Sequence, residues 1–416
     1  MREKALLVTV NLGKAHGWTS KERSDELREL AISAGAKVIR EIVVSVKSIN
    51  PAYFIGSGKA VEIGALCASE GAGVVIFNND LSGTQQKNIE DIVNTKTIDR
   101  TQLILDIFAR RARSNEGKLQ VELAQLLYMM PRLTGKGVEL SRLGGGIGTR
   151  GPGEQKLEVD RRRIRSRIDH LRTNLEDLSK RRSMMRSRRD RFSILSVAII
   201  GYTNVGKSTL INVLTDSDVI VADKLFATLD PTIRTFVMPN RQKILFADTV
   251  GFLNELPHHL IEAFKATLEE VVEADVLLHM VDASHPKAIA QSEAVYKVLE
   301  EIGAKGKNII TVLNKIDKIS DPNLLEDLKK NFYDPVSISA TTKHGLDKLV
   351  DRLAKEMNHL VVTAEFTIPA SDARTLNIIH NNGVVKRQEY RGESLYIEAE
   401  LPIRIKESID RLLAHS

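Results

Sequence analysis

Residues 201–209 read GYTNVGKST and follow residues 193–200, an apolar stretch typical of a buried strand. The spacing of Gly201, Gly206, Lys207 and Ser208 is that of a phosphate-binding loop between a strand and a helix. Such glycines let backbone N–H groups turn toward phosphates, the lysine places a charge at the β and γ oxygens, and the serine hydroxyl binds magnesium. The stretch predicts a doubly wound α/β domain with its ligand at the strand ends.

Three further short motifs follow, each at the end of an apolar strand. We call these motifs boxes and count the phosphate loop as the first box. Residues 248–251 (DTVG) offer Asp248 to magnesium through water and a glycine N–H to the γ-phosphate. In residues 314–317 (NKID), the Asp317 carboxylate can accept from two N–H groups of guanine, whereas adenine would leave this charge unpaired. Asn314 is expected to tie neighbouring loops together, and backbone N–H groups of residues 339–341 (SAT) can meet the guanine carbonyl. We therefore predict GTP, GDP and Mg²⁺ as ligands.

Residues 225–236 (LFATLDPTIRTF) lie where a switch loop should supply a threonine to magnesium and the γ-phosphate. The Phe-x-Thr-Leu pattern resembles the Obg-like switch, which favours Thr228 and leaves Thr232 as the alternative. The predicted metal ligands are therefore Ser208, Thr228 or Thr232, and Asp248 through water. The predicted nucleotide-binding residues are Gly201, Tyr202, Thr203, Asn204, Val205, Gly206, Lys207, Ser208, Thr209, Phe226, Ala227, Thr228, Leu229, Asp230, Asp248, Thr249, Val250, Gly251, Asn314, Lys315, Ile316, Asp317, Ser339, Ala340 and Thr341.

Two residues bear on hydrolysis, and the sequence names no catalytic residue. Ras-like GTPases place a water-orienting glutamine after Asp-x-x-Gly, whereas Phe252 stands there and cannot hydrogen-bond water. We therefore expect unassisted hydrolysis to be slow. Asn204 resembles the P-loop asparagine of potassium-stimulated GTPases, so K⁺ is a candidate further cofactor; the alternative is a loop asparagine that caps the backbone.

The segment after the second box carries His258 and His259, but adjacent histidines point to different helix faces. We interpret them as helix-start residues and not as metal ligands. The apolar spacing that follows predicts one amphipathic helix through Leu260, Phe264, Leu268 and Val271.

Charge is unevenly distributed along the chain, whose net charge is +6. Residues 105–191 hold 22 Lys and Arg against 11 Asp and Glu, a local balance of +11. A basic segment suggests a polyanionic partner such as nucleic acid, although a solvated helix surface explains the charge equally well. Heptad-like spacing of apolar residues predicts a two-helix antiparallel hairpin around a glycine-rich tip, residues 142–154. Its apolar residues are Leu119, Leu123, Leu126, Leu127, Met130, Leu157, Ile164, Ile168, Leu171, Leu175 and Leu178.

The remaining pattern divides the 416 residues into four predicted domains. Residues 1–104 alternate expected strands (5–10, 37–46, 73–77 and 97–105, the last running into a helix) with helices (24–33, 58–69, 84–93). This alternation indicates a small α/β domain with a mainly parallel sheet. Residues 105–192 form the basic hairpin, residues 193–360 the P-loop domain, and residues 361–416 a small α+β domain. A single cysteine, Cys67, excludes an intramolecular disulfide, and no apolar run approaches membrane-spanning length. We expect a cytoplasmic, monomeric protein without a membrane span.

The motifs together resemble the HflX family of GTPases over nearly the whole chain. They are ELAQLLYMMPRL (122–133), LSRLGGGIGTRGPGE (140–154), LEVDRRRI (157–164), GYTNVGKSTL, FATLDPT, DTVGFLNELPHHLIEAFKATLEE (248–270) and NKID. Gln155-Lys156 departs from the family pattern locally, whereas the hydrophobic Phe252 agrees with it.

The resemblance implies a GTPase that binds the large ribosomal subunit and its rRNA through the 105–192 arm, with the glycine-rich tip near the peptidyl transferase centre. It also implies that GTP favours ribosome splitting and that ribosomes stimulate hydrolysis. Two alternatives stay open. One is a GTP-regulated rRNA-binding or ribosome-assembly factor, and the other is a signalling GTPase with protein partners.

Overall fold

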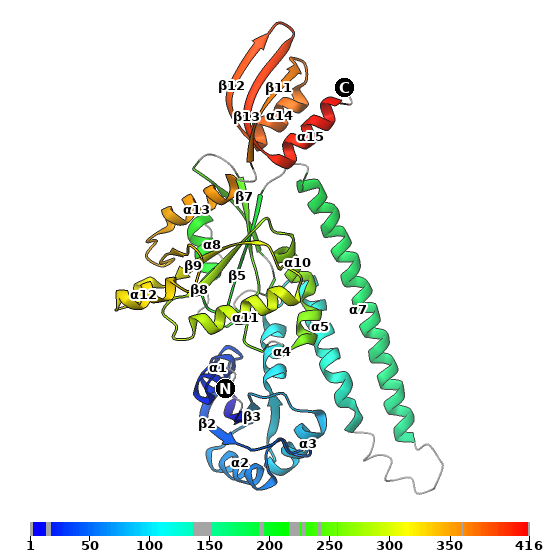
Figure 1. Ribbon diagram of the computed structural model, residues 1–416. Coiled ribbons are helices and arrows are strands. Elements are labelled where there is room, and N and C mark those ends of the chain that lie inside the picture. Colours follow the sequence, from blue (N-terminus) through cyan, green and yellow to red (C-terminus); the bar gives the residue numbers. More distant parts are fainter. Residues whose placement is uncertain are drawn as a thin grey trace. The chain divides into compact units, whose positions relative to one another are not determined.

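The computed structural model in Figure 1 describes residues 3–13, 18–135, 152–190, 195–215, 225–226, 229–230, 232–239, 243–255, 257–358 and 361–414. Its contacts divide the chain into two compact units. The first unit comprises Met1–Glu176, Ala222–Leu229 and Leu256–Phe264, and the second comprises Asp177–Val221, Asp230–Glu255 and Lys265–Ser416. The chain therefore returns to the first unit twice after leaving it. The division into four domains is finer than this and stays a prediction.

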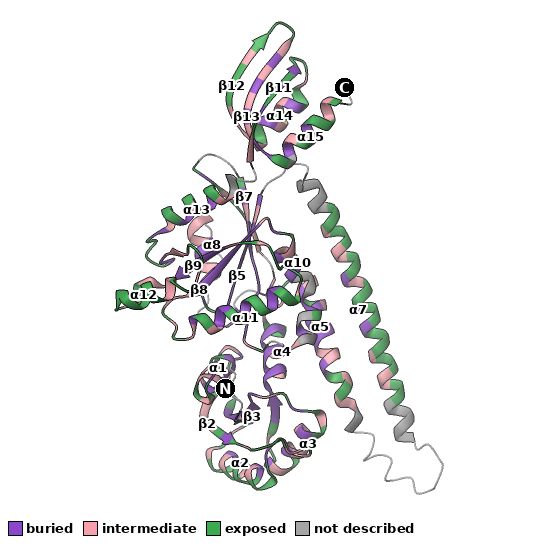
Figure 2. Cartoon of the chain, in the orientation of Figure 1, coloured by how far each residue is buried: buried purple, intermediate pink, exposed green. Residues whose placement is uncertain are grey.

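The first unit contains a four-stranded parallel sheet in the order β2-β1-β3-β4. Its strands are β1 (Lys4–Asn11), β2 (Lys37–Ser45), β3 (Val74–Phe77) and β4 (Lys96–Asp99), and its helices are α1 (Ser20–Ser33), α2 (Ser57–Glu70), α3 (Gly83–Val93) and α4 (Arg100–Arg111). Strands β1, β3 and β4 are largely buried, whereas Val44 is the one buried residue of β2 (Figure 2). The expected stretch 97–105 runs from a strand into a helix as predicted, because the Asp99 side chain accepts a hydrogen bond from the Gln102 N–H and starts α4 there.

A helical hairpin follows in the same unit. It consists of α5 (Asn115–Met129), a short 3-10 helix, η1 (Met130–Gly135), and α7 (Pro152–Asp190), which continues into the second unit. The predicted apolar seam forms its core: Leu123 packs with Ile168, Leu171 and Leu175. Arg167 pairs with Glu122 across the two helices at 2.7 Å. The glycine-rich tip lies mostly outside the described residues, as does the side chain of Leu157.

The second unit contains a six-stranded sheet in the order β10-β9-β8-β5-β7-β6, parallel except for β6. The strands are β5 (Leu195–Gly201), β6 (Thr232–Val237), β7 (Lys243–Asp248), β8 (Val276–Asp282), β9 (Asn308–Asn314) and β10 (Val336–Ser337). The helical elements are α8 (Lys207–Thr215), α10 (Lys265–Glu273), α11 (Ala288–Glu301), η2 (Ile316–Lys318), α12 (Pro322–Lys329) and α13 (Leu346–Asn358). This confirms the predicted doubly wound α/β fold.

The C-terminal segment forms its own antiparallel sheet in the order β11-β13-β12. Its elements are β11 (Val361–Pro369), α14 (Ala373–Asn382), β12 (Val384–Arg391), β13 (Ser394–Pro402) and α15 (Ile403–Ala414). A separate apolar cluster includes Phe366, Ile397 and Ile409. The predicted α+β appendage is therefore present.

The helix expected after the second box is two helices. Its first part, α9 (His258–Ala263), belongs to the first unit, and the second part, α10, belongs to the second unit. The break falls at Phe264, whose backbone has φ −95° and ψ 8°. Leu260, Phe264, Leu268 and Val271 are all buried as predicted, so the apolar spacing is right although the single helix is wrong.

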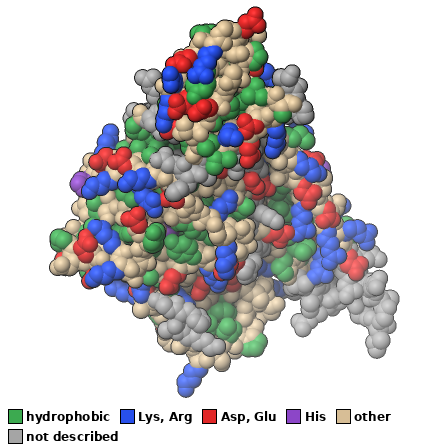
Figure 3. Space-filling view, turned by 45° about the horizontal axis from the view of Figure 1, so that its top comes forward, with side chains coloured by type: hydrophobic (Ala, Val, Ile, Leu, Met, Phe, Trp, Pro, Cys, Tyr) green, Lys and Arg blue, Asp and Glu red, His purple; other side chains and the backbone are tan. Residues whose placement is uncertain are grey.

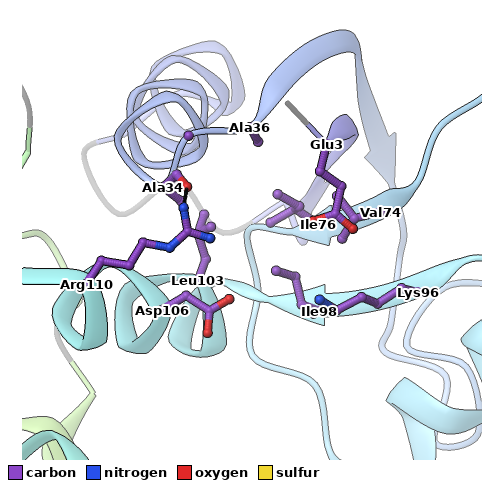
Figure 4. A pocket seen from close by; sticks show the side chains of 11 residues that line it. Glu3, Ala34, Ala36, Val74, Ile76, Lys96, Ile98, Leu103, Asp106 and Arg110 are labelled. Carbon is purple, nitrogen blue, oxygen red and sulfur yellow. Dashed lines mark hydrogen bonds between the residues drawn. The ribbon is translucent and has the colours of Figure 1, made fainter. Parts of the chain in front are cut away.

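A cavity of about 550 Å³ lies in the first unit, beside α4 and the amino ends of the strands (Figure 4). Ile76, Ile98 and Leu103 supply apolar lining, while Lys96 and Asp106 supply charges. Burial raises the pKa of the Asp106 carboxyl. Ligands of open α/β sheets bind at the carboxyl ends of strands, and none of the predicted nucleotide-binding residues lines this cavity. Within the described parts of the chain, no helix is both long and apolar enough to span a membrane.

Candidate nucleotide site

The phosphate loop connects the end of β5 to the start of α8, as the sequence predicted. Its glycines are required by close packing. A Cβ on Gly201 would lie 2.4 Å from the Met280 carbonyl oxygen, and one on Gly206 would lie 2.5 Å from Asn314 Nδ2. Both glycines also have positive φ, 152° and 97°, which other residues rarely adopt. The loop can therefore keep this path only with glycine at both positions.

Lys207 is buried at the start of α8, with its side chain curled into the loop. Its Nζ donates to the carbonyl oxygens of Tyr202 at 2.8 Å and Gly201 at 3.2 Å. Burial lowers the pKa of Lys207 to about 8, and the nearby Asp248 charge opposes this shift. A phosphate that accepts from Nζ would raise this pKa again, because a neighbouring anion favours the ammonium.

The first and second boxes meet at the carboxyl ends of β5 and β7. The Ser208 hydroxyl donates to Asp248 Oδ2 at 2.7 Å. A Cβ on Gly251 would lie 3.1 Å from Lys207 Nζ, so the backbone of the second box lies against the lysine. A serine hydroxyl and a carboxylate this close form an oxygen donor set of the kind that Mg²⁺ prefers, so the residues fit the metal.

The guanine-side boxes are joined to the phosphate loop by side chains. Asn314 is buried; its Nδ2 donates to the Val205 carbonyl at 2.7 Å, and its Oδ1 accepts from the Ala340 N–H at 3.0 Å. Lys315 Nζ donates to the Asn204 carbonyl oxygen at 2.7 Å. These contacts bring three of the predicted boxes together around one edge of the sheet.

Two further features of this edge concern the base. Asp317 lies exposed in η2, so its carboxylate is accessible to a ligand. Asp282, at the end of β8, forms an ion pair with Lys315 at 2.7 Å and was missed by the sequence interpretation. Asp282 is an acidic residue at the end of an apolar strand, and the boxes lie at the ends of neighbouring strands. This position could have indicated a site residue, because the loops that bind ligands gather at these strand ends.

Other residues that were predicted to bind the nucleotide lie in the same loops. Thr203 is buried beside Gly251, and the buried Thr249 hydroxyl donates to the Ile199 carbonyl oxygen at 2.6 Å. Ser339 is fully buried, and its hydroxyl accepts from the Thr342 N–H at 3.1 Å. The remaining members of these boxes in the same unit are Thr209, Val250, Ile316 and Thr341.

Phe252 is only 2% exposed, and its backbone pairs with the phosphate loop. Its N–H donates to the Gly201 carbonyl at 3.1 Å, and its carbonyl accepts from the Thr203 N–H at 2.9 Å. The Tyr202 hydroxyl accepts from the Asn254 N–H at 2.7 Å. The side chain that replaces a water-orienting glutamine is therefore part of the core.

The switch segment is divided between the two units. Phe226 and Leu229 are buried and belong to the first unit, whereas Asp230 belongs to the second. Ala227 and Thr228 lie outside the described residues, so the role of Thr228 stays a prediction. Thr232 opens β6, opposite Asp248 in the register. Asn204 is exposed with φ 62°.

These boxes, gathered at the carboxyl edge of a doubly wound sheet, define a P-loop GTPase. Three family models match the sequence. Residues 21–109 match "GTP-binding GTPase N-terminal", residues 111–189 match "GTP-binding GTPase Middle Region", and residues 196–315 match "50S ribosome-binding GTPase".

Two relatives that cover nearly the whole chain agree with this class. GTPase HflX of Caldanaerobacter subterraneus subsp. tengcongensis is 47% identical over 98% of this chain and 93% of its own length. GTPase HflX of Escherichia coli K12 is 41% identical over 92% of this chain and 90% of its own length. A crystal structure of a GTP-binding protein from Sulfolobus solfataricus in complex with GDP is 28% identical, covers 86% of this chain and all of its own, and has a TM-score of 0.46. The chain belongs to the HflX family of GTPases. It binds GTP and GDP and hydrolyses GTP, as the boxes predicted.

Proposed function

We propose that this GTPase binds the large ribosomal subunit through its helical arm and promotes the separation of ribosomal subunits. The observation that carries the proposal is the exposed basic surface of α7. The description of the family that residues 196–315 match, a 50S ribosome-binding GTPase, supports it. Membership of the HflX family supports it as well, because the predicted arm lies within the matched length.

The charges of α7 fall into two groups with different uses. Arg167 and Arg172 pair with Glu122 and Glu262 within the first unit, so their charges are already partnered inside the protein. Arg162, Arg165 and Arg181 are exposed and form no ion pair with the described part of the chain. Lys and Arg side chains are frequent over the side of Figure 3 where α7 lies. Such cations are available to phosphates, which dominate the affinity of proteins for nucleic acid.

At the nucleotide, we assign the contacts by chemistry and position. Asp317 accepts from guanine, and Lys207 leaves its two carbonyl partners to bind the β- and γ-phosphates. Ser208, Thr228 and, through water, Asp248 hold Mg²⁺, which neutralises charge on the phosphates when bound. The backbone N–H of Gly251 donates to the γ-phosphate, so the chain can distinguish GTP from GDP at this residue.

Hydrolysis in this proposal needs a partner. The buried Phe252 side chain cannot orient water, so the chain binds and positions GTP but hydrolyses it slowly by itself. Binding to the ribosome fixes the switch segment and the second box around the γ-phosphate in the conformation that hydrolysis needs. GTP then favours the subunit-separating state, and loss of the γ-phosphate releases it.

The proposal is tested by incubating intact ribosomes with the protein and GTP, GDP or a non-hydrolysable GTP analogue, followed by sucrose-gradient sedimentation. We expect free subunits with GTP and with the analogue, and intact ribosomes with GDP. Unchanged ribosome profiles in all three samples would rule out ribosome splitting. Binding to free large subunits without splitting would favour the second candidate, a GTP-regulated rRNA-binding or assembly factor, because it shares the basic arm.

Two variants test the arm itself. Replacement of Arg162, Arg165 and Arg181 by glutamate should abolish association with the large subunit. In the single variants, the slope of log affinity against log salt concentration should become shallower by about 0.7–0.9 for each phosphate that is no longer neutralised. The matched control replaces three exposed lysines outside the arm, Lys297, Lys348 and Lys355, by glutamate. Equal weakening in both triple variants would show a general charge effect and not a docking surface.

Removal of residues 144–153 addresses the tip. It should abolish ribosome-stimulated hydrolysis and leave GTP binding intact, because the nucleotide boxes lie in another unit. Stimulation that survives the deletion would show that the tip is dispensable.

A further inference from the structure

Three phenylalanine rings meet inside the first unit, and each comes from a different segment. Phe108 lies in α4, Phe226 in the predicted switch segment, and Phe264 at the end of α9. The Phe108 ring contacts Phe226 at 4.6 Å and Phe264 at 4.7 Å between centroids. Interplanar angles of 77° and 70° are edge-to-face contacts, the arrangement that aromatic pairs prefer. All three side chains are at most 4% exposed.

Phe226 and Phe264 come from two short segments that belong to the first unit but interrupt the sequence of the second. Ala222–Leu229 and Leu256–Phe264 belong to the first unit, although the chain on both sides of each belongs to the second. Phe226 lies two residues before Thr228, the predicted magnesium ligand. Phe264 ends the helix that follows the second box. The switch segment and the helix that follows the second box therefore share one contact residue, Phe108.

Other contacts hold the same two segments in the first unit. The Leu225 N–H donates to Ser33 Oγ of α1 at 3.0 Å. Glu262 of α9 pairs with Arg172 of α7 at 2.8 Å, and α9 packs along α5. Phe226 has φ 57°, which is unfavourable for a residue other than glycine and persists where surrounding contacts fix the backbone. The ring cluster is therefore one of several contacts that fix these two segments in the first unit.

We propose that Phe108 is a positioning residue for GTP hydrolysis, which holds the switch segment and the segment after the second box (through α9 and Phe264) in the positions that the reaction needs. The proposal rests on the proposed function only in taking Thr228 and residues 248–251 as contacts of the γ-phosphate. Phe108 touches no nucleotide and acts through Phe226 and Phe264. Because Phe252 cannot orient water, the chain itself contributes to the reaction by partly ordering these segments before the ribosome binds. Small displacements near reacting groups cost rate steeply.

The test uses the full chain without ribosomes, so it does not depend on ribosome splitting. Phe108→Leu keeps an apolar side chain and removes the ring. We expect kcat for GTP hydrolysis to fall about tenfold. The affinity for fluorescent GDP should stay within about twofold, because the boxes for guanine and the β-phosphate belong to the second unit.

The matched control is Phe77→Leu, which removes a fully buried ring from β3 in the core of the same unit. It should lower stability but leave kcat within about twofold. A decrease in kcat that follows stability equally in both variants would overturn the proposal. So would an unchanged or raised kcat in Phe108→Leu. Failure of the wild-type protein to bind GDP would instead overturn the assignment of the nucleotide site, so the two failures are distinguishable.

A second measurement addresses the coupling. If Phe108 and Phe226 act through one contact, the Phe108→Leu/Phe226→Leu double variant should be no slower than the slower single variant. Hydrogen exchange of residues 225–226 and 257–264 should also rise together in Phe108→Leu and stay unchanged in Phe77→Leu. Multiplicative decreases in rate, or faster exchange in only one segment, would refute the shared anchor.

Discussion

His279 gives the sharpest prediction about stability, because a titratable ring lies in the centre of the second sheet. It lies in β8, is 1% exposed and packs edge-on against Tyr296 at 5.0 Å between ring centroids. The Phe332 ring lies 6.5 Å from the His279 ring between centroids. Burial lowers the pKa of His279 from 6.5 to about 3, and the nearby Lys207 charge acts in the same direction. The folded protein therefore holds this imidazole neutral.

The direction of the pH dependence follows from that shift. A base whose pKa is depressed by folding contributes stability above its unfolded pKa, and this contribution is lost as pH falls from about 6.5 toward about 3. With these two values, the folded state loses about 2 kcal/mol between pH 7 and pH 5 through this residue alone. The full loss, reached near pH 3, would be about 5 kcal/mol.

Hydrogen exchange of the β8 amides at pH 7 and pH 5, corrected for intrinsic exchange, measures the opening free energy of the strand. His279→Phe keeps an aromatic ring against Tyr296 and cannot take up a proton. We expect its opening free energy to fall between the two pH values by about 2 kcal/mol less than that of the wild type. The control is His344→Phe, at an exposed position. If wild type and His279→Phe lose the same free energy, burial of a neutral His279 is not a source of acid sensitivity.

Three further predictions concern the nucleotide site. Asp317→Asn should shift preference from guanine toward xanthine nucleotides, because an amide can donate where the carboxylate accepted; unchanged GTP preference in competition assays would refute the assignment. Asn314→Ala should weaken GDP binding about tenfold to a thousandfold, since Val205 and Ala340 are each left without a buried hydrogen-bond partner, and fluorescence titration with an unchanged affinity would contradict this. If Asn204 helps to hold a monovalent cation, turnover should be faster in potassium than in sodium buffer, and equal rates would refute the hypothesis.

The fold and most of the nucleotide edge could be predicted because their signals are local in sequence. A strand followed by Gly201-x4-Gly206-Lys207-Ser208 specifies backbone path, charge and metal ligand within one short stretch. The hairpin seam was predictable for the same reason, since helical spacing places apolar residues on one side. Asp282 was not predictable in this way: its pairing with Lys315 joins two strand ends whose proximity comes from the order of strands in the sheet.

The break at Phe264 shows why the switch segments were harder to predict. Apolar residues continue at helical spacing from Leu260 to Val271, and all four are buried, so periodicity contains no sign of an interruption. The two halves nevertheless bury their apolar sides against different partners: α9 packs on α5 in the first unit, and α10 packs on β5 in the second. The break in the helix at Phe264 therefore coincides with the residue at which the chain passes from one unit to the other. Phe264 is the last residue of the first unit at one of the points where the chain passes between the units, and its ring contacts Phe108. The residue at which helical prediction fails is therefore also a member of the ring cluster that fixes α9 in the first unit.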